Sequence, residues 1–269
     1  MSLKLTLHTV PQVPMEADAL TPERMQGMSA VEAAKLPLLH GNQKACVGDF
    51  FDVAGTGDEL LQIAGDLGRV KHVGAAMSRG RLEVDGNVGL HLGSAMTGGE
   101  ILVNGNAGDW VGPEMSGGSI TIKGNAGHMV GSVHRGGTVG MRGGQIIVHG
   151  NAGNEAGNGM RNGLIAIGGN TGDFTGVNLR AGTIVVLGQL GARSGPSMLR
   201  GSIVSLHNAE LPPTFTYSCT YRPVFLRVYL LHLRDCGLDV DDAALDGAYN
   251  RYCGDSIEMN RGEVLLLQN

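Results

Sequence analysis

Apolar and polar residues alternate over short segments that recur along the middle of the chain. Residues 61–206 repeat a unit close to I-x-V-x-G-N-A-G-x-x-x-G-x-x-M-x-x-G, and residues 101–118 are one copy. Two apolar residues with one residue between them face the same side of a strand, and no 3.6-residue period occurs in this stretch. We therefore predict a series of short strands whose inward pairs are Leu82/Val84, Ile101/Val103, Ile120/Ile122, Ile146/Val148, Ile165/Ile167 and Ile184/Val186.

The repeat has a nearly constant period. Its anchor glycines are separated by 21, 19, 19, 26, 19 and 19 residues, and they are Gly65, Gly86, Gly105, Gly124, Gly150, Gly169 and Gly188. A fixed period of this size indicates a solenoid, and equivalent strands of successive coils can pair in parallel. We predict an all-β fold, a right-handed parallel β-helix of about seven 19-residue coils. The 26-residue step is a seven-residue insertion between Gly131 and Met141, expected to form a loop that leaves the coil unchanged.

Further columns keep the same register. Glycines recur seven and thirteen residues after the anchor, where we expect tight corners with positive φ. A methionine column ten residues after the anchor should fill the core; it comprises Met96, Met115, Met141, Met160, Leu179 and Met198. Asparagines directly after the anchor should form stacked amides that bond one another along the helix; these are Asn87, Asn106, Asn125, Asn151 and Asn170.

The flanks differ from the repeat. Residues 1–56 are predicted to form an N-terminal cap, residues 57–207 the glycine-rich β-helix, and residues 208–269 a C-terminal cap with one helix. In the first flank Thr21-Pro22 has a helix-start signature and Ser29 with Glu32 a capping box. Residues 4–9 and 50–53 are predicted strands, the second at the edge of the stack. In the last flank we predict a helix over residues 223–235 and a strand over residues 264–267.

Composition narrows the class of protein. The chain has 269 residues, 45 glycines, 4 % aromatic residues and a net charge of −5, which gives no reason to expect nucleic acid. It contains no run of 18 apolar residues and its start lacks the apolar core of a signal peptide. The four cysteines, Cys46, Cys219, Cys236 and Cys253, form no CxxC and are interpreted as reduced thiols. These features predict a cytoplasmic protein with no membrane partner.

Candidate catalytic groups are few. The chain has no HExxH, Walker-type phosphate loop or G-x-S-x-G, and His128, His134 and His149 match no metal-ligand spacing. Asp109 and His128 are expected to be neighbours on adjacent coils. Such a pair could be catalytic in a β-helix polysaccharide enzyme, but an Asp–His pair of this kind is more often a surface hydrogen bond. Asp173 lies three coils from Asp109, ~14 Å, too far for paired glycosidase carboxylates. We predict no catalytic, cofactor-binding or metal-binding residue.

Arginines and aromatic residues suggest interfaces instead. Arg142, Arg161 and Arg180 each follow the methionine column, so they should point outward from three adjacent coils, ~4.8 Å apart, with Arg200 close to the same line. Stacked like charges repel unless a counter-charge is present, and arginine suits carboxylates. The hypothesis is that this column meets an acidic partner surface; the alternative is a solvated arginine face. A second candidate interface comprises Trp110, Tyr217, Tyr221, Phe225 and Tyr229.

Several segments resemble a known family. The repeats LVNGNAGDWVGPEMSGG, TIKGNAGHMVGS and IIVHGNAGNEAGNGMRNG, with VGDFFDV, TYRPVFLR and NRYCGD in the flanks, resemble the C subunit of formylmethanofuran dehydrogenase over essentially the whole chain. The repeat alone is also similar to the C-terminal domain of the large glutamate synthase subunit. Bacterial members of this C-subunit family belong to a formyltransferase/hydrolase complex, and the overall likeness favours that branch.

The resemblance implies a function. It implies a non-catalytic scaffold subunit in one-carbon metabolism that joins an amidohydrolase-type A subunit, a B subunit and a formyltransferase D subunit. The complex would convert formyl-tetrahydromethanopterin to formate through a methanofuran-like carrier, and this chain would bind no cofactor itself. Such carriers bear glutamyl tails, a second candidate for the arginine column. The alternatives are the C subunit of a molybdenum or tungsten formylmethanofuran dehydrogenase, a polysaccharide-active enzyme, and a glutamate-synthase-like module that associates with an amidotransferase.

Overall fold

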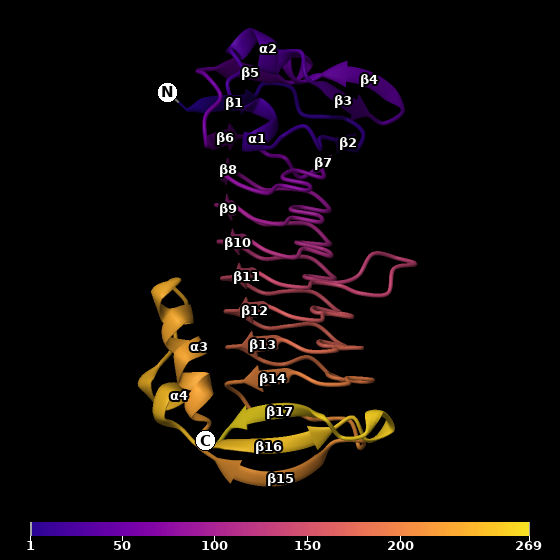
Figure 1. Ribbon diagram of the computed structural model, residues 1–269, viewed down its shortest axis with the longest axis vertical. Helices are drawn as coiled ribbons and strands as arrows, with labels where there is room; N and C mark the ends of the chain where they lie inside the picture. The colour runs from indigo at the N-terminus through magenta and orange to yellow at the C-terminus, as the bar shows by residue number, and fades with distance from the viewer. Residues whose placement is uncertain (1, 269) are drawn as a thin grey trace.

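The molecule is an elongated stack with the N-terminal elements at one end and the C-terminal strands at the other (Figure 1). The computed structural model describes residues 2–268. One thirteen-stranded sheet runs through the stack in the order β15-β16-β17-β14-β13-β12-β11-β10-β9-β8-β6-β1-β5. The helices are few and short, so the predicted all-β class is confirmed. No helix within residues 2–268 is long and apolar enough to cross a membrane.

The repeats form parallel strands that pair in chain order. These strands are β6 (Leu60–Ala64), β8 (Arg81–Asp85), β9 (Glu100–Val103), β10 (Ser119–Ile122), β11 (Gln145–Val148), β12 (Leu164–Ile167), β13 (Thr183–Val186) and β14 (Ser202–Ser205). A second row of parallel bridges joins the following turns, as at Val88↔Ala107 and Ala107↔Ala126. The insertion leaves the stack as a loop (Figure 1), and Ser119 of β10 pairs with Gln145 of β11 beyond it, as expected.

The core lies inside the coils and is made by the columns that the pattern predicted. All twelve residues of the six apolar pairs are at most 2 % exposed, and every member of the methionine column is fully buried. One such residue per layer stacks on the next along the axis. Burying a methionine or isoleucine side chain contributes about 1.5–3 kcal/mol of hydrophobic free energy. The inward repeat therefore stabilises each coil through its neighbours.

Glycine is required at the corners for two different reasons. Gly112 has φ = +60° and lies in a buried corner, which fits the prediction of positive φ. Anchor glycine Gly105 has no positive φ; a Cβ there would lie 2.5 Å from the carbonyl oxygen of Gly86 in the preceding coil. From Gly105 to Gly188, close approach of backbones rather than a left-handed conformation excludes larger residues from the column, whereas Gly65 and Gly86 also have positive φ. Positive φ also occurs at non-glycine residues in a column of the second turn: His72, His91, Trp110, Met129, Glu155, Phe174 and Arg193.

The N-terminal elements cover the first coil. Strand β1 (Leu3–Leu7) pairs in parallel with β6, and β5 (Phe51–Ala54) forms the edge of the large sheet, as predicted. Thr21 caps α1 (Pro22–Met25) and Ser29 forms the predicted capping box with Glu32 at the start of α2 (Ala30–Ala34). A small sheet lies beside them, made of β4 (Gln43–Cys46), β3 (Pro37–His40), β2 (Met15–Glu16) and β7 (Val70–Lys71).

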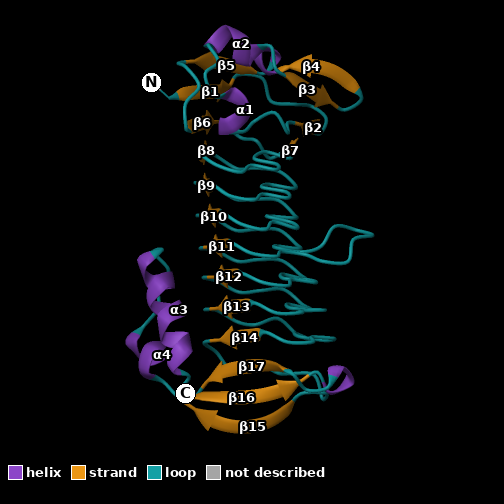
Figure 2. Cartoon of the chain, viewed as in Figure 1, coloured by secondary structure: helices purple, strands orange, loops and turns teal. Residues whose placement is uncertain are grey.

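The C-terminal segment extends the sheet and covers one of its faces. Strand β17 (Gly262–Leu267), the predicted last strand, pairs in parallel with β14. Strands β16 (Tyr249–Gly254) and β15 (Thr216–Tyr221), which the pattern did not predict, follow in antiparallel order. The predicted helix is α3 (Val224–Asp235), and a short α4 (Asp242–Asp246) follows it. Both helices lie along the side of the coils rather than over their end (Figure 2).

Apolar residues on the outward side of the strands explain the position of α3. Along β11 to β14 the outward residues are Ile147, Ala166, Val185 and Val204, all buried against Leu226, Leu230 and Leu233 of the helix. The equivalent residues of β8 and β10, Glu83 and Thr121, are polar, whereas Leu102 of β9 is apolar and half-buried. His232 of α3 bonds Gln145 of β11 at 2.7 Å.

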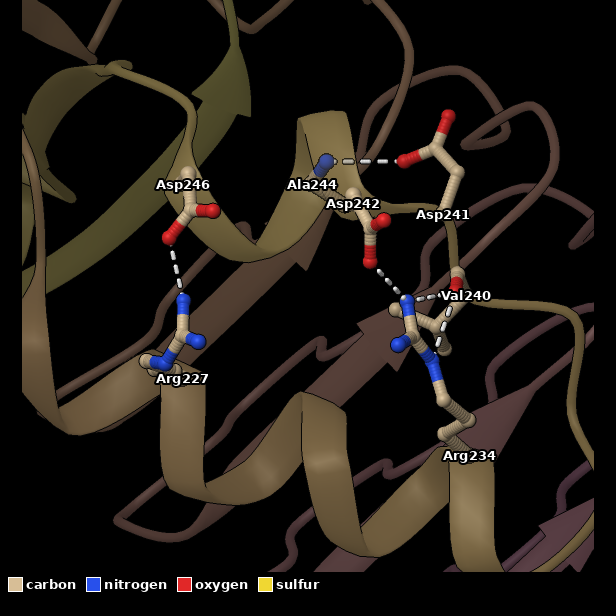
Figure 3. Close-up of polar contacts among 7 residues, drawn as sticks. All are labelled: Arg227, Arg234, Val240, Asp241, Asp242, Ala244 and Asp246. Carbon is tan, nitrogen blue, oxygen red and sulfur yellow. Dashed lines mark hydrogen bonds and ion pairs between the residues drawn. The ribbon is translucent and has the colours of Figure 1, made fainter.

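Polar contacts join α3 to α4 and to the residues just before α4. Arg227 pairs with Asp246, and Arg234 donates to the carbonyl oxygen of Val240 and to Asp242 (Figure 3). Asp241 accepts the backbone N–H of Ala244 at 2.7 Å and thereby caps α4 (Figure 3). The two helices are therefore held to each other as well as to the sheet.

The asparagine column bonds mainly to the backbone and not, as predicted, from amide to amide. The side-chain oxygen of Asn106 accepts the backbone N–H of Asn125 at 2.8 Å, and each asparagine repeats this with the next coil. Among the described residues of this column, amide-to-amide bonds occur only at Asn106–Asn87 and Asn125–Asn106. The backbone N–H is the better partner because it has a fixed position in each coil.

Candidate docking surfaces

Arginines of successive coils lie on one exposed line. Arg161 donates its backbone N–H to the carbonyl oxygen of Met141, and Arg180 does the same to Met160, both at 2.8 Å. These bonds keep the arginines in register while the preceding residues point into the core. Arg142, Arg161, Arg180 and Arg200 are all exposed. The outward column that the repeat predicts is therefore present, with Arg200 displaced by one residue because Leu199 occupies its register position.

The last strand adds a fifth arginine that the sequence pattern missed. Strand β17 pairs with β14 so that Glu263 lies opposite Ser202, which places Arg261 alongside Arg200. Sixty-one residues separate these two arginines in the chain. The repeat had ended before Arg261, so no period pointed to it. The arginine line, which we define as Arg142, Arg161, Arg180, Arg200 and Arg261, supplies one arginine from each of five successive layers.

Four of these arginines line an open groove. Arg161, Arg180, Arg200 and Arg261 surround a volume of about 430 Å³ together with Leu199, Met259, Ala181 and Glu258. Glu258 is the one carboxylate among the lining residues, and it makes no ion pair with them within residues 2–268. The groove is therefore strongly basic along a chain whose net charge is −5.

The side chains of the arginine line differ from those of most other arginines, because within residues 2–268 they have no partner. Of fifteen arginines in the sequence, nine have a hydrogen-bond, ion-pair or aromatic partner: Arg24, Arg69, Arg79, Arg81, Arg135, Arg193, Arg227, Arg234 and Arg251. Within residues 2–268 six have none, namely Arg222 and the five of the line. The unpaired arginines are thus concentrated on one surface.

Trp110, one of the predicted interface residues, belongs to a stack of rings. It is half-buried, and its ring lies 5.1 Å from that of His91, which in turn stacks on His72 at 4.8 Å. His134 of the insertion approaches His91 at 5.3 Å, and the guanidinium of Arg135 lies 5.9 Å from the Trp110 ring. The insertion therefore folds over the stack.

Burial keeps one ring of this stack, that of His91, uncharged at neutral pH. Loss of water around His91, with the neighbouring charges of His72 and His134, lowers its pKa to about 4. His91 is therefore neutral at pH 7. The insertion is held by His134, whose Nε2 lies 3.1 Å from Ser94 Oγ and whose backbone N–H donates to Glu114 at 3.2 Å. Arg135 of the same loop lies over the Trp110 ring, so Trp110 contributes to the attachment of the loop.

The outer side of α3 is an exposed apolar face. Val224 is 83 % exposed and Val228 71 %, while Phe225 and Leu231 are 42 % and 39 % exposed. Val224, Val228 and Leu231 follow the i, i+4, i+7 spacing of one helical side. Among the predicted tail aromatics, Tyr217 and Phe225 are exposed, whereas Tyr221 and Tyr229 are partly buried against the helix–sheet core. An apolar stripe of this kind is typical of a protein interface.

The predicted Asp109–His128 pair is part of a structural ladder. Asp109 accepts the backbone N–H of His128 at 2.8 Å, and His128 Nδ1 accepts the backbone N–H of Asn154 at 2.9 Å. The side chains thus bond the next coil rather than each other. Within residues 2–268 no cluster of three or more His, Cys, Asp or Glu is placed to hold a metal ion.

The repeat identifies the family. The GXGXG motif family model matches residues 63–215, more than half of the chain. The chain belongs to the GXGXG family. Its homologues are C subunits of formylmethanofuran dehydrogenases and of a formyltransferase/hydrolase complex, which confirms the resemblance seen in the repeat units.

Two curated relatives and one solved structure define the likeness. The chain is 44 % identical over 81 residues to the C subunit of molybdenum-containing formylmethanofuran dehydrogenase 1 of Methanothermobacter thermautotrophicus, covering 29 % of this chain and 20 % of that protein. It is 36 % identical over 86 residues to the C subunit of the formyltransferase/hydrolase complex Fhc of Methylorubrum extorquens, covering 31 % and 32 %. These matches thus span between a fifth and a third of the relatives.

The solved structure is similar over the whole chain. It is a chain of the crystal structure of the formyltransferase/hydrolase complex FhcABCD from Methylorubrum extorquens in complex with methylofuran. That chain is 34 % identical, with a TM-score of 0.92 over 99 % of this chain and 100 % of the other. The flanks and the coils together therefore have the architecture of that chain.

Proposed function

We propose that this chain is a non-catalytic structural subunit of a formyltransferase/hydrolase complex. The observation that carries the proposal is the likeness to a chain of such a complex over 99 % of the residues at 34 % identity. The likeness includes β15 to β17 and α3, which lie outside the GXGXG repeat. A shared repeat alone would favour only a solenoid, whereas shared flanks favour the same surroundings.

The proposal extends to the reaction of the assembly. The complex would take the formyl group of formyl-tetrahydromethanopterin through a methanofuran-like carrier to formate, in the cytoplasm. An amidohydrolase-type A subunit, a B subunit and a formyltransferase D subunit would be the partners, and this chain would bind no cofactor itself. The methylofuran of the similar crystal structure supports the carrier. The exposed aromatic residues and arginines of this chain would then contact the partner subunits.

The fold suits a scaffold. Successive strands in one sheet are connected by crossovers, which are right-handed in nearly all proteins, so we propose that the coil is a right-handed parallel β-helix. Residues 1–56 and 208–269 would be the two caps and residues 57–207 the coils. A rod held by buried columns and backbone bonds keeps its surfaces at fixed separations. Partners bound at different layers would therefore be held at fixed distances from one another.

The first test is a purification of the tagged chain from its native source. We expect subunits of amidohydrolase and formyltransferase type to copurify, with formyltransferase activity that the isolated chain lacks. Molybdenum or tungsten in the complex would assign the chain to the redox branch, whose C subunits are also its relatives. A lone chain without these subunits would overturn the proposal.

A surface variant tests whether α3 carries one of the contacts. Val228→Asp places a charge on an exposed position of the apolar face, so it should weaken assembly at least tenfold while leaving the melting temperature unchanged. Val31→Asp is the control, because Val31 is 67 % exposed on α2 at the other end. Equal assembly of both variants would show that the outer face of α3 does not touch a partner.

A further inference from the structure

We propose that the arginine line binds an acidic segment of a partner protein in the assembly, a peptide stretch rich in Asp and Glu that runs along the coils. The inference rests on the proposed function, because it requires an assembly. It goes beyond that function by assigning one surface and the chemistry of what covers it. Three observations support it: the missing counter-charges, the regular spacing and the apolar residues of the groove.

The chain pairs arginines elsewhere with acids from neighbouring strands or coils. Arg81 lies 3.8 Å from Glu100 of the next strand, Arg193 lies 2.6 Å from Asp173 of the preceding coil, and Arg251 lies 2.7 Å from Glu263 of the adjacent strand. The same repeat could supply acids beside the arginine line and does not. Two charges about 4–5 Å apart repel by about 1 kcal/mol even in water. An external carboxylate-rich surface would remove this repulsion.

The spacing determines the length of the occupant. Five layers at ~4.8 Å give four steps, so the line is ~19 Å long. An extended peptide rises ~3.3 Å per residue, so about six residues span it. The guanidinium fork binds carboxylates bidentately, and arginine side chains are long enough to reach acids that do not match the layer spacing. A single small anion would engage only one or two of the five arginines.

Apolar side chains beside the arginines favour a protein segment over a free anion. Leu199 and Met259 line the groove, and Ile257 lies next to Glu258 on the 3₁₀ turn Ser256–Glu258. Met259 and Ile257 are 69 % and 74 % exposed. Arginine and methionine are enriched at protein interfaces, where apolar contacts accompany the charges. A peptide with acids and apolar residues would use both.

Cross-linking inside the assembled complex tests the occupant directly. Leu199→p-benzoylphenylalanine introduces a photoreactive group into the groove of the full chain, and mass spectrometry identifies the peptide it captures. We expect a segment of another subunit with at least three Asp or Glu in six residues. Capture of a neutral or basic segment, or of no other subunit, would overturn the proposal.

Charge reversal tests the energetics. In Arg161→Glu/Arg180→Glu we expect the dissociation constant of the purified partner subunit to rise at least tenfold, and the salt dependence of binding between 50 and 200 mM NaCl to fall. The control Lys35→Glu/Lys44→Glu makes the same change in charge at exposed positions of the N-terminal elements, and should bind as the unaltered chain does. Arg161→Lys/Arg180→Lys should keep most of the affinity.

The outcomes separate the two proposals. If the unaltered chain associates with no formyltransferase or hydrolase subunit, the proposed function fails and this inference fails with it. Suppose instead that the unaltered chain associates, and that Arg161→Glu/Arg180→Glu binds as tightly as the control Lys35→Glu/Lys44→Glu. The proposed function then stands, and the arginine line is a solvated face. Loss of affinity for the partner in Arg161→Glu/Arg180→Glu, but not in Lys35→Glu/Lys44→Glu, supports the acidic segment.

Discussion

The side-chain oxygen of Asn125 accepts a hydrogen bond from the backbone N–H of Asn151 at 2.8 Å, across the insertion. The other steps of this ladder join residues 19 positions apart, and this one joins residues 26 apart. The bond therefore keeps the same geometry although seven more residues lie between its ends. The ladder and the buried columns, rather than the length of the intervening chain, set where each coil lies.

Removing one step of the ladder should have a small and specific cost. Asn125→Ala removes the acceptor for the backbone N–H of Asn151, so we expect the free energy of unfolding to fall by about 1 kcal/mol. Urea denaturation measures this change. Asn104→Ala is the control, since Asn104 is exposed and makes no side-chain hydrogen bond within residues 2–268. Equal effects of the two substitutions would show that the ladder adds nothing to stability.

The two reasons for glycine can be separated by a pair of substitutions. Gly105→Ala brings a Cβ within 2.5 Å of the Gly86 carbonyl oxygen, so the coils must move apart and we expect a loss of about 2–3 kcal/mol. Gly136→Ala, in the insertion, meets nothing within 4 Å but has φ = +85°, and should cost about 1–2 kcal/mol through backbone conformation alone. Urea denaturation measures both losses. A larger effect at Gly136 would contradict the close-approach argument.

The methionine column should tolerate a change of shape better than a loss of volume. Met160 is fully buried, so Met160→Ala should cost about 2–5 kcal/mol by leaving a cavity. Met160→Leu should cost less than about 1.5 kcal/mol, because Leu179 already occupies the next position of the column. Thermal and urea unfolding of both variants measure the difference. Comparable losses in the two variants would mean that the site needs the methionine itself.

Stability should fall as pH decreases from about 6.5 towards 4, in part because of His91. Its pKa is about 4 in the folded chain against 6.5 in a model peptide, so the unfolded chain binds the proton more readily in this window. The groups around it are His72, His134 and Lys71, which oppose its protonation, and Asp109, which favours it. His91→Phe removes the titration and keeps a ring, as Phe174 shows at the same column position with φ = +61°.

Urea denaturation between pH 4 and 7 measures this effect. The variant should lose less stability on acidification than the unaltered chain, whereas exposed His8→Phe, outside the stack, should leave the pH dependence as it is. An unchanged pH dependence in His91→Phe would show that His91 does not contribute to it.

The elements that could be predicted are those where one local requirement repeats. The apolar pairs and the methionine column recur because each coil needs the same inward residues, and the caps of α1 and α2 depend on residues three positions apart. Strand β15 escaped prediction because Thr216–Tyr221 is almost entirely exposed, and β16 because burial does not alternate between its buried ends, Tyr249 and Gly254. The outward Ile147, Val185 and Val204 were a signal for the position of α3, since three apolar outward residues on nearby strands indicate a covered face.

The candidate site divides in the same way. The period of the repeat determines by itself that Arg142, Arg161 and Arg180 share one outward line, because residues in the same register of a solenoid must lie above one another. Only the tertiary structure brings Arg261 beside Arg200, because β17 returns to pair with β14 after a segment without any repeat. It alone turns Trp110 into a support for the insertion, because that contact depends on where His134 and Arg135 fold back. Periodic sequence encodes the contacts between equivalent residues, whereas contacts between unlike segments follow from the packing of the whole chain.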